Sequence, residues 1–154
     1  MALRERILAD TKDAMKAKET ARLSTLRLIS AAIKDREIAA RTEGGEQGGL
    51  TEADLIAILS KMVKQRQESA KAYEEGGRLE LAEREEDEIR VIQSYLPRQL
   101  DEAEAAAAID KAIADLGAES IRDMGRVMAE LRARHAGQMD FGAAGPVIKA
   151  RLMK

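Results

Sequence analysis

The sequence predicts an all-α protein in two parts, a four-helix bundle-like domain at residues 1–96 and a small three-helix domain at residues 97–154. Two prolines in 154 residues, with abundant Ala, Leu, Glu, Lys and Arg, favour helices over strands. Apolar side chains recur every three or four positions, which places them on one face of a helix. Pro97 cannot continue a helix, so the boundary between the two domains is expected there.

Four helices are predicted in the first domain. Their apolar stripes cover residues 3–15, 23–38, 55–73 and 79–96. Thr51 can cap the third helix through its hydroxyl, with Asp54 in the reciprocal position of a capping box. Gly76-Gly77 ends that helix, and Pro97 ends the fourth because it lacks the amide proton that a helix interior needs. Residues 42–49 hold four glycines and no apolar side chain, which predicts a mobile loop.

Three shorter helices are predicted in the second domain. They lie at residues 102–116, 121–134 and 141–152. The predicted N-caps, whose side chains can accept hydrogen bonds from first-turn amides, are Asp101, Ser120 and Asp140. Gly117 ends the first of these helices. Pro146 lies too deep to be a first-turn proline if Asp140 is the cap, so the last helix is expected to kink or to begin near Gly145.

Composition and charge exclude several classes of protein. The chain has no cysteine, which rules out disulfides, thiolate metal sites and thiol catalysis. No apolar window approaches the length of a membrane span, so we expect a cytoplasmic protein with no membrane partner. The net charge is −2, but residues 1–41 carry +4, residues 74–88 carry −6 and residues 117–154 carry +3. Local fields of this kind can steer an anionic partner.

Glu85 and Glu88 are carboxylates that the helical pattern places on or beside the apolar stripe of their helix. Inward carboxylates of a helical bundle can hold two metal ions, but such sites also use histidine, and the first domain has none. We therefore expect no metal. The alternative is ion pairing with Arg27, Lys64 or Arg66, each close to the inward face of its own helix. A pair of that kind fixes the register of helices.

Self-sufficient catalysis is not expected. His135, the only histidine, precedes Ala136-Gly137 at a predicted helix end, where a capping role is favoured and no partner for acid–base chemistry is visible. The sequence has no Ser-His-acid order of a catalytic triad and no glycine loop with the spacing that cradles phosphates. We expect no cofactor, and we assign any catalysis to an enzyme that this chain assists.

The helix that follows Asp123 has two contrasting sides. Its apolar stripe comprises Met124, Val127, Met128 and Leu131, and the opposite side comprises Arg122, Gly125, Arg126, Ala129 and Ala133. Guanidinium groups suit phosphate recognition, although most exposed arginines only solvate a helix. With three aromatic residues, all at apparent core positions, the chain has no platform on which single-stranded bases can stack. Any RNA contact must use phosphate and shape, and the predicted contacts are Arg122, Arg126, Arg132, Arg134 and Lys149, with Arg151 as a further candidate.

Short motifs spread over nearly the whole chain form a set whose order and spacing are specific. They are Ala14-Met15-Lys16, Leu26-Arg27, Lys64-Gln65-Arg66, Glu68-Ser69, Gly77-Arg78, Leu81-Ala82, the run from Glu85 to Ile89, Tyr95-Leu96-Pro97, Gln99-Leu100, Asp123-Met124-Gly125, Val127-Met128, Gly137 and Asp140. In this set the chain resembles the YqeY-like proteins, which are similar to the C-terminal tail of the GatB subunit of tRNA-dependent amidotransferases. The glycine-rich loop and residues 141–146 depart from the family pattern.

The resemblance implies an all-helical adaptor without catalytic machinery of its own. In the amidotransferase the related tail binds tRNA, so the leading hypothesis is a second domain that binds tRNA or another structured RNA through phosphate contacts. The alternative is a module that docks on an amidotransferase or another protein through its small-residue face. A third hypothesis is an accessory to a carbon–nitrogen ligase with glutamine as amido-N-donor, or a true amidotransferase. No catalytic residue is carried over from the family.

Overall fold

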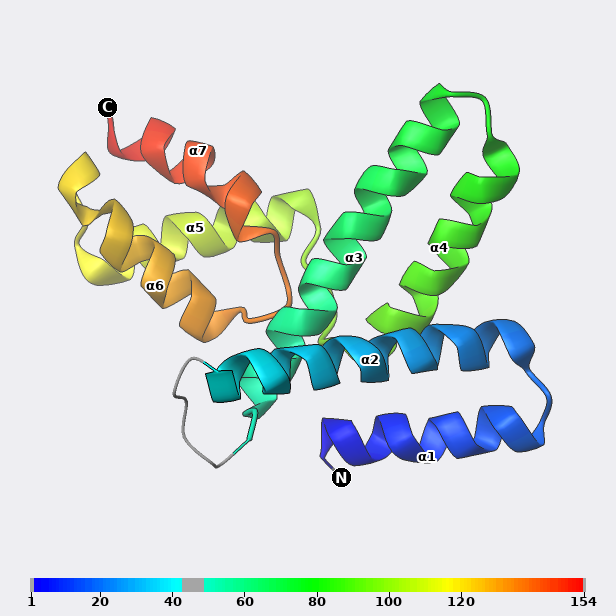
Figure 1. The fold of residues 1–154 in the computed structure, drawn as a ribbon. Coiled ribbons are helices and arrows are strands. Elements are labelled where there is room, and N and C mark those ends of the chain that lie inside the picture. The colour runs from blue at the N-terminus through cyan, green and yellow to red at the C-terminus, as the bar shows by residue number, and fades with distance from the viewer. Residues whose placement is uncertain (1, 43–48, 154) are drawn as a thin grey trace. The chain divides into compact units, whose positions relative to one another are not determined.

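The protein is all-α, as predicted. The computed structural model describes residues 2–42 and 49–153, and in these residues it contains seven α-helices, one 3₁₀ turn and no strand (Figure 1). The glycine-rich loop predicted at residues 42–49 falls almost entirely outside the described residues. Two compact units, Met1–Leu96 and Pro97–Lys154, each have a hydrophobic core of their own. We call them the N-terminal unit and the C-terminal unit.

The N-terminal unit consists of two helical hairpins. Its helices are α1 (Leu3–Lys16), α2 (Thr20–Thr42), α3 (Glu52–Glu75) and α4 (Leu79–Gln93). Within this unit the α1–α2 hairpin lies across the α3–α4 hairpin (Figure 1), and α2 contacts both helices of the second hairpin. Because the hairpins cross, the four-helix bundle-like arrangement predicted from the sequence is not confirmed. No described helix in either unit has the length and apolar content needed to cross a bilayer.

Local signals in the sequence account for both ends of α3 and for the end of α4. Thr51 and Asp54 form the predicted capping box, with hydrogen bonds of 3.1 and 2.9 Å between side chain and amide in the two directions. Gly77 follows α3 with a φ of +75°, a conformation that favours glycine. The fourth helix ends at Gln93, three residues earlier than predicted. Pro97 explains this, because its ring would clash with the carbonyl of Gln93 and it has no amide to donate there.

The hydroxyl of Tyr95 ties the end of α4 to α1. Tyr95 is buried and donates a hydrogen bond to the Asp10 carboxylate. The guanidinium of Arg6 lies 5.3 Å from the centroid of the Tyr95 ring. Burial, the hydrogen bond and the charge of Asp10 raise the pKa of Tyr95 from 10.0 to about 12. The folded protein therefore holds the neutral phenol.

Replacing Tyr95 with phenylalanine should reveal how much the Tyr95–Asp10 hydrogen bond contributes to stability, and how that contribution depends on pH. We expect Tyr95→Phe to lower the free energy of unfolding by about 1 kcal/mol at pH 7, the usual net value of one hydrogen bond. Because the folded pKa is raised, this stability is complete below pH 10 and is lost as the pH rises through about 12. Urea unfolding at neutral pH and near pH 11 measures it. Tyr73→Phe is the control, since the hydroxyl of the half-buried Tyr73 has no such bond among the described residues. Equal losses from Tyr95→Phe at both pH values would contradict the assignment.

The C-terminal unit packs three α-helices around a small core. They are α5 (Glu102–Leu116), α6 (Met124–Arg134) and α7 (Phe141–Leu152), and a 3₁₀ turn, η1 (Ile121–Asp123), precedes α6. The core residues are Ile109, Ala112, Val127, Leu131, Ala144, Ile148 and Leu152. Asp101 and Glu104 form the predicted capping box of α5, and Gly117 ends that helix with a φ of +62°. The sequence thus located all three α-helices of this unit.

Two details of the C-terminal unit differ from the prediction. The helix expected at 121–134 begins as a 3₁₀ turn, Ile121–Asp123, in which the Asp123 carboxylate accepts hydrogen bonds from the amides of Glu119 and Ser120 at 3.0 and 3.3 Å. The last helix does not begin near Gly145. It begins at Phe141, since the Asp140 carboxylate accepts bonds from two first-turn amides, and it continues through Pro146.

Candidate nucleic-acid interface

Helix α6 divides into a buried side and an exposed side, as its sequence predicts. Val127 and Leu131 are fully buried, and Met124 and Met128 pack against the same core. The opposite side is exposed and comprises Gly125, Arg126, Ala129 and Ala133, with Arg122 exposed on the preceding turn. A Cβ atom added to Gly125 would meet nothing within 4 Å, so the packing of this unit does not require glycine there.

Two of the candidate RNA contacts are already held by acidic side chains. Arg134 donates to Glu130 and to Asp115 of α5, each at 2.9 Å. The hydrogen bond from Arg134, together with the nearby cation of Lys111, keeps the pKa of Asp115 below its ordinary value. Arg151 of α7 binds Asp110 of α5. These guanidinium groups connect helices of the C-terminal unit and have little capacity left for a phosphate.

Arg126 has one acidic partner on the adjacent turn. Its guanidinium lies 3.0 Å from the Asp123 carboxylate, and its side chain is 55% exposed. The backbone amide of Glu119, the Arg126 guanidinium and the Ser120 amide lower the pKa of Asp123, so this carboxylate stays ionised. An exposed pair of this kind is weak and leaves part of the guanidinium open to a second anion.

Three candidate contacts have no acidic partner within the described part of the chain. Arg122 on η1 and Lys149 on α7 are exposed, and neither contacts a carboxylate there. Arg132 lies over the ring of Phe141, with 5.7 Å between its guanidinium carbon and the ring centroid. This contact orients Arg132 without neutralising it. The elements that carry these cations are neighbours, because α7 packs against both η1 and α6.

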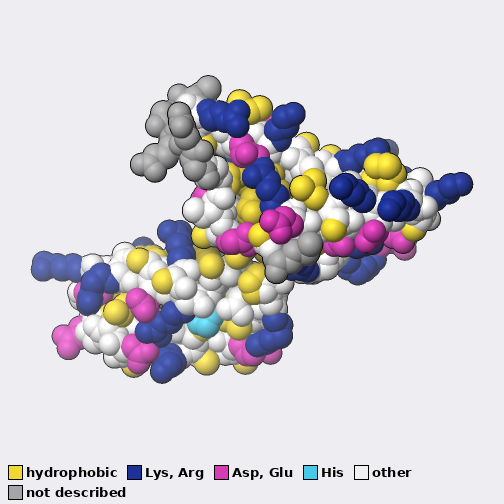
Figure 2. All heavy atoms as spheres, turned by 90° about the horizontal axis from the view of Figure 1, so that it is seen from below, with side chains coloured by type: hydrophobic (Ala, Val, Ile, Leu, Met, Phe, Trp, Pro, Cys, Tyr) yellow, Lys and Arg dark blue, Asp and Glu magenta, His cyan; other side chains and the backbone are white. Residues whose placement is uncertain are grey.

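The surface of the C-terminal unit mixes both signs of charge. Figure 2 shows dark-blue basic side chains separated by acidic ones around the single histidine of the chain. A continuous basic patch is therefore not present on the face shown. The aromatic rings are equally limited, since Tyr95 is buried, Tyr73 and Phe141 are half-buried, and Arg132 covers Phe141. Tyr73 and Phe141 are thus less buried than the core positions predicted for them.

His135 lies at the end of α6, where its backbone amide donates to the Leu131 carbonyl at 2.8 Å. Its ring Nδ1 lies 3.1 Å from the side-chain oxygen of Gln138. The Gln138 carbonyl accepts a hydrogen bond from the Leu100 amide at 2.8 Å, and the Gln138 side chain donates to the Arg98 carbonyl at 3.1 Å. These bonds fasten residues 97–101 to the loop between α6 and α7. Sequence reasoning missed this role of Gln138, because no local pattern marks it.

The predicted ion-pair residues of the N-terminal unit occupy different environments. Arg66 and Glu88 approach each other, with 3.8 Å between Nε and Oε1 and side chains only 16% and 20% exposed. Burial and the Glu88 charge raise the pKa of the half-buried Glu85, and Arg66 opposes that shift. Lys64 is exposed. Arg27 is also exposed and reaches no carboxylate among the described residues, so its predicted inward position is wrong.

Similarity to known proteins decides the family of the chain. The sequence model of the family described as "Yqey-like protein" matches residues 4–152, which is nearly the whole chain. The chain belongs to the YqeY-like family.

Neither unit of this YqeY-like protein holds three His, Cys, Asp or Glu side chains grouped for a metal ion within residues 2–42 and 49–153.

Curated relatives of this YqeY-like protein come from yeasts. The protein "Altered inheritance of mitochondria protein 41, mitochondrial" of Clavispora lusitaniae is 40% identical over 95 residues, which are 62% of this chain and 52% of that protein. Its namesake in Lachancea thermotolerans is 35% identical over 109 residues, which are 70% and 56% of the two chains. The YqeY-like chain thus spans about half the length of these relatives. Their names, which are those of mitochondrial proteins, contradict the predicted cytoplasmic location.

Proposed function

We propose that the C-terminal unit binds tRNA or another folded RNA as a non-catalytic adaptor. The observation that carries this proposal is the set of three cations without an acidic partner among the described residues, Arg122, Arg132 and Lys149, on elements that pack together. A cation that is already paired with a carboxylate would have to leave it before binding a phosphate. These three side chains have no such pair to break within the described part of the chain. Resemblance to the tRNA-binding tail of an amidotransferase supports the same assignment.

The mode of binding follows from the side chains that the unit offers. No exposed aromatic face is available in the described C-terminal unit, since Phe141 is covered by Arg132, so stacking of unpaired bases contributes little. Duplex regions of folded RNA are recognised instead by shape and by contacts to phosphates and 2′-hydroxyls. Three or four cations make a small electrostatic footprint, and binding should be moderate and sensitive to salt.

Removal of the three cations is the decisive experiment. We expect the triple variant Arg122→Ala, Arg132→Ala, Lys149→Ala to weaken binding of a folded tRNA about tenfold or more at low salt. The slope of log affinity against log salt should fall by about one for each lost phosphate contact. Arg126→Ala should have a smaller effect, because Asp123 already shares its guanidinium. Fluorescence anisotropy across a salt series measures both quantities.

A charge-matched control tests the location of the interface. The variant Lys12→Ala, Lys61→Ala, Lys71→Ala removes three exposed cations from the N-terminal unit and should leave affinity nearly unchanged. Equal losses in the two triple variants would indicate unspecific attraction and reject the interface. Absence of tRNA binding by the wild-type protein at low salt would reject the function itself.

The exposed small residues of α6 favour a second candidate function. Gly125, Ala129 and Ala133 leave space for close approach by another backbone, and the packing of the unit gives no reason for glycine at position 125. Under this proposal the same face docks on a protein partner, such as an amidotransferase or another carbon–nitrogen ligase that uses glutamine. Ala129→Trp distinguishes the two candidate functions. It should block docking of a flat protein surface on α6, while it leaves every cation of the RNA interface in place.

A further inference from the structure

A groove between α1 and α2 combines an apolar floor with a basic rim. It has a volume of about 370 Å³ and lies within the N-terminal unit. Four apolar side chains form its floor and wall, namely Ile7, Leu8, Ile33 and Ile38. Leu8 is 53% exposed and Ile38 is 49% exposed, although both face a neighbouring helix. The hydrophobic core of the N-terminal unit thus continues into a partly exposed apolar surface.

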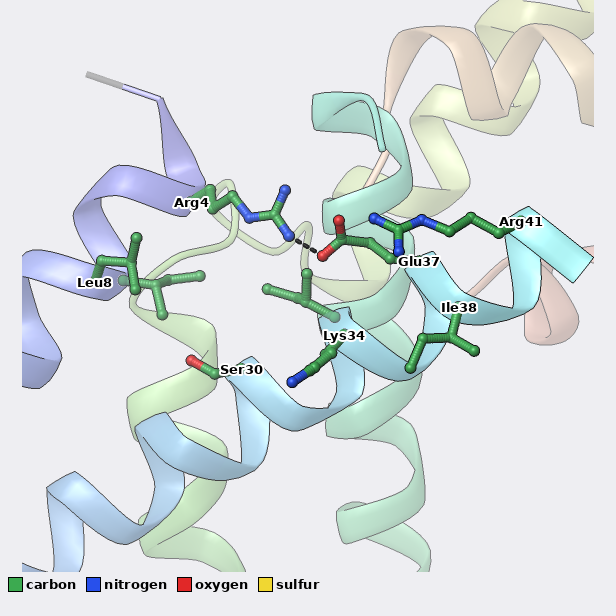
Figure 3. A pocket seen from close by; sticks show the side chains of 9 residues that line it. Arg4, Leu8, Ser30, Lys34, Glu37, Ile38 and Arg41 are labelled. Atoms are coloured by element: carbon green, nitrogen blue, oxygen red, sulfur yellow. Dashed lines mark hydrogen bonds and ion pairs between the residues drawn. The ribbon is translucent and has the colours of Figure 1, made fainter. Parts of the chain in front are cut away.

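The rim of the groove carries an excess of positive charge. Arg4, Lys34 and Arg41 line it, and Glu37 is the single acid among the described lining residues. Arg4 reaches across from α1 and pairs with Glu37 on α2 (Figure 3), so these two charges neutralise each other. Lys34 and Arg41 are exposed and contact no carboxylate within the described residues. Two cations therefore remain beside the apolar floor.

The spacing of the lining residues has the period of a helix. On α2 they are Ser30, Ile33, Lys34, Glu37, Ile38 and Arg41, a stripe at i, i+3, i+4, i+7, i+8 and i+11. Such a stripe runs along three turns, about 17 Å at 1.5 Å per residue. Lys34 and Arg41 lie two turns apart on it, separated by about 10.5 Å along the axis. An elongated occupant with two anionic groups at that separation matches the groove.

We propose that the α1–α2 groove binds an amphipathic, acidic α-helix of a partner protein. Apolar side chains at i, i+3, i+4 and i+7 of that helix would cover Leu8 and Ile38, and carboxylates seven residues apart would meet Lys34 and Arg41. Charge complementarity selects this occupant over a lipid, because a lipid has one charged headgroup whereas these two cations are spread along the groove. The site is independent of the RNA interface and uses none of its residues.

Selection of helical peptides tests the proposal. The probe is a display library of amphipathic peptides of about 15 residues, long enough to form four helical turns, selected on the full wild-type chain. We expect the enriched peptides to be acidic, with apolar residues at helical spacing. They should bind Ile38→Glu at least about tenfold more weakly than the wild type, a difference of about 1.4 kcal/mol. Leu28→Glu is the matched control, because Leu28 is similarly exposed on α2 but lies outside the groove.

Reversal of one charge makes the test specific for the rim. Lys34→Glu should weaken an enriched acidic peptide about tenfold and should strengthen a version in which its facing glutamate is replaced by lysine. Enrichment of basic or neutral peptides, no enrichment at all, or equal binding to Ile38→Glu would overturn the proposal. A wild-type dimer that Ile38→Glu converts to monomer in analytical ultracentrifugation would assign the groove to a second copy and would also overturn it. Circular dichroism verifies that each variant is folded.

Discussion

Leu131→Ala is expected to lower the stability of the C-terminal unit by about 3 kcal/mol, within the usual range for truncation of a buried leucine. Leu131 is completely buried and belongs to the core cluster that joins α5, α6 and α7. A unit of this size has only about 3–9 kcal/mol of stability in total. The substitution should therefore remove about a third or more of the stability of the unit, although alanine itself favours a helix.

Hydrogen exchange measured by mass spectrometry can locate this effect. Faster exchange is expected throughout α5, α6 and α7, with little change in the core helices of the N-terminal unit. Val147→Ala is the control, because Val147 on α7 is 37% exposed and its truncation should cost less than about 1 kcal/mol. Under the proposed function the variant should also bind folded RNA more weakly, since Arg122, Arg132 and Lys149 lie on elements that this core packs together. Unchanged exchange in Leu131→Ala would show that this core does not hold the unit together.

Arg66→Met is expected to destabilise the N-terminal unit by about 2 kcal/mol at pH 7. The change removes the cation that faces Glu88 and opposes the raised pKa of Glu85, and it leaves two half-buried carboxylates close together. Complete burial of a broken pair costs about 3–5 kcal/mol, and the partial exposure of these side chains reduces that value. Methionine retains most of the packing of the arginine stem.

The pH dependence distinguishes this electrostatic loss from a packing defect. Burial and the charge of Glu88 raise the pKa of Glu85 in the folded protein above 4.5. Protonated Glu85 therefore contributes its full stabilisation below pH 4.5, and this stabilisation is lost as the pH rises through the folded pKa. Without Arg66 the penalty at neutral pH grows, and it should shrink as the pH falls toward 4. Denaturant unfolding at both pH values measures the difference. Arg90→Met removes an exposed pair with Asp87 and should change stability by less than about 0.5 kcal/mol.

The helices were predictable because their signals are local. A capping box such as Thr51 with Asp54 needs only four consecutive residues, and Gly117 ends its helix through its own backbone conformation. Two helix bounds differ from the prediction, and both differences also have local causes. Pro97 acts four residues upstream and shortens α4, and Asp140 caps α7 firmly enough for the helix to continue past Pro146.

The candidate site was only partly predictable, because the availability of a cation depends on distant residues. Arg134 and Arg151 looked equivalent to Arg122 and Lys149 in the sequence. The structure separates them, since acids on α5 hold the first two and leave the other two without a partner among the described residues. The partners of Arg151 and Arg134 lie 41 and 19 positions away in the chain. No helical periodicity reports contacts over such separations.

The helical class of this YqeY-like protein, the approximate bounds of its helices and the apolar side of α6 follow from the sequence alone. Those properties depend on backbone sterics, capping and the 3.6-residue period, which act within a few turns. Which charges are neutralised, and which large apolar side chains stay about half exposed, as Leu8 and Ile38 do, became visible only in the folded chain. Both depend on which helices pack together, and that packing is set by the whole chain.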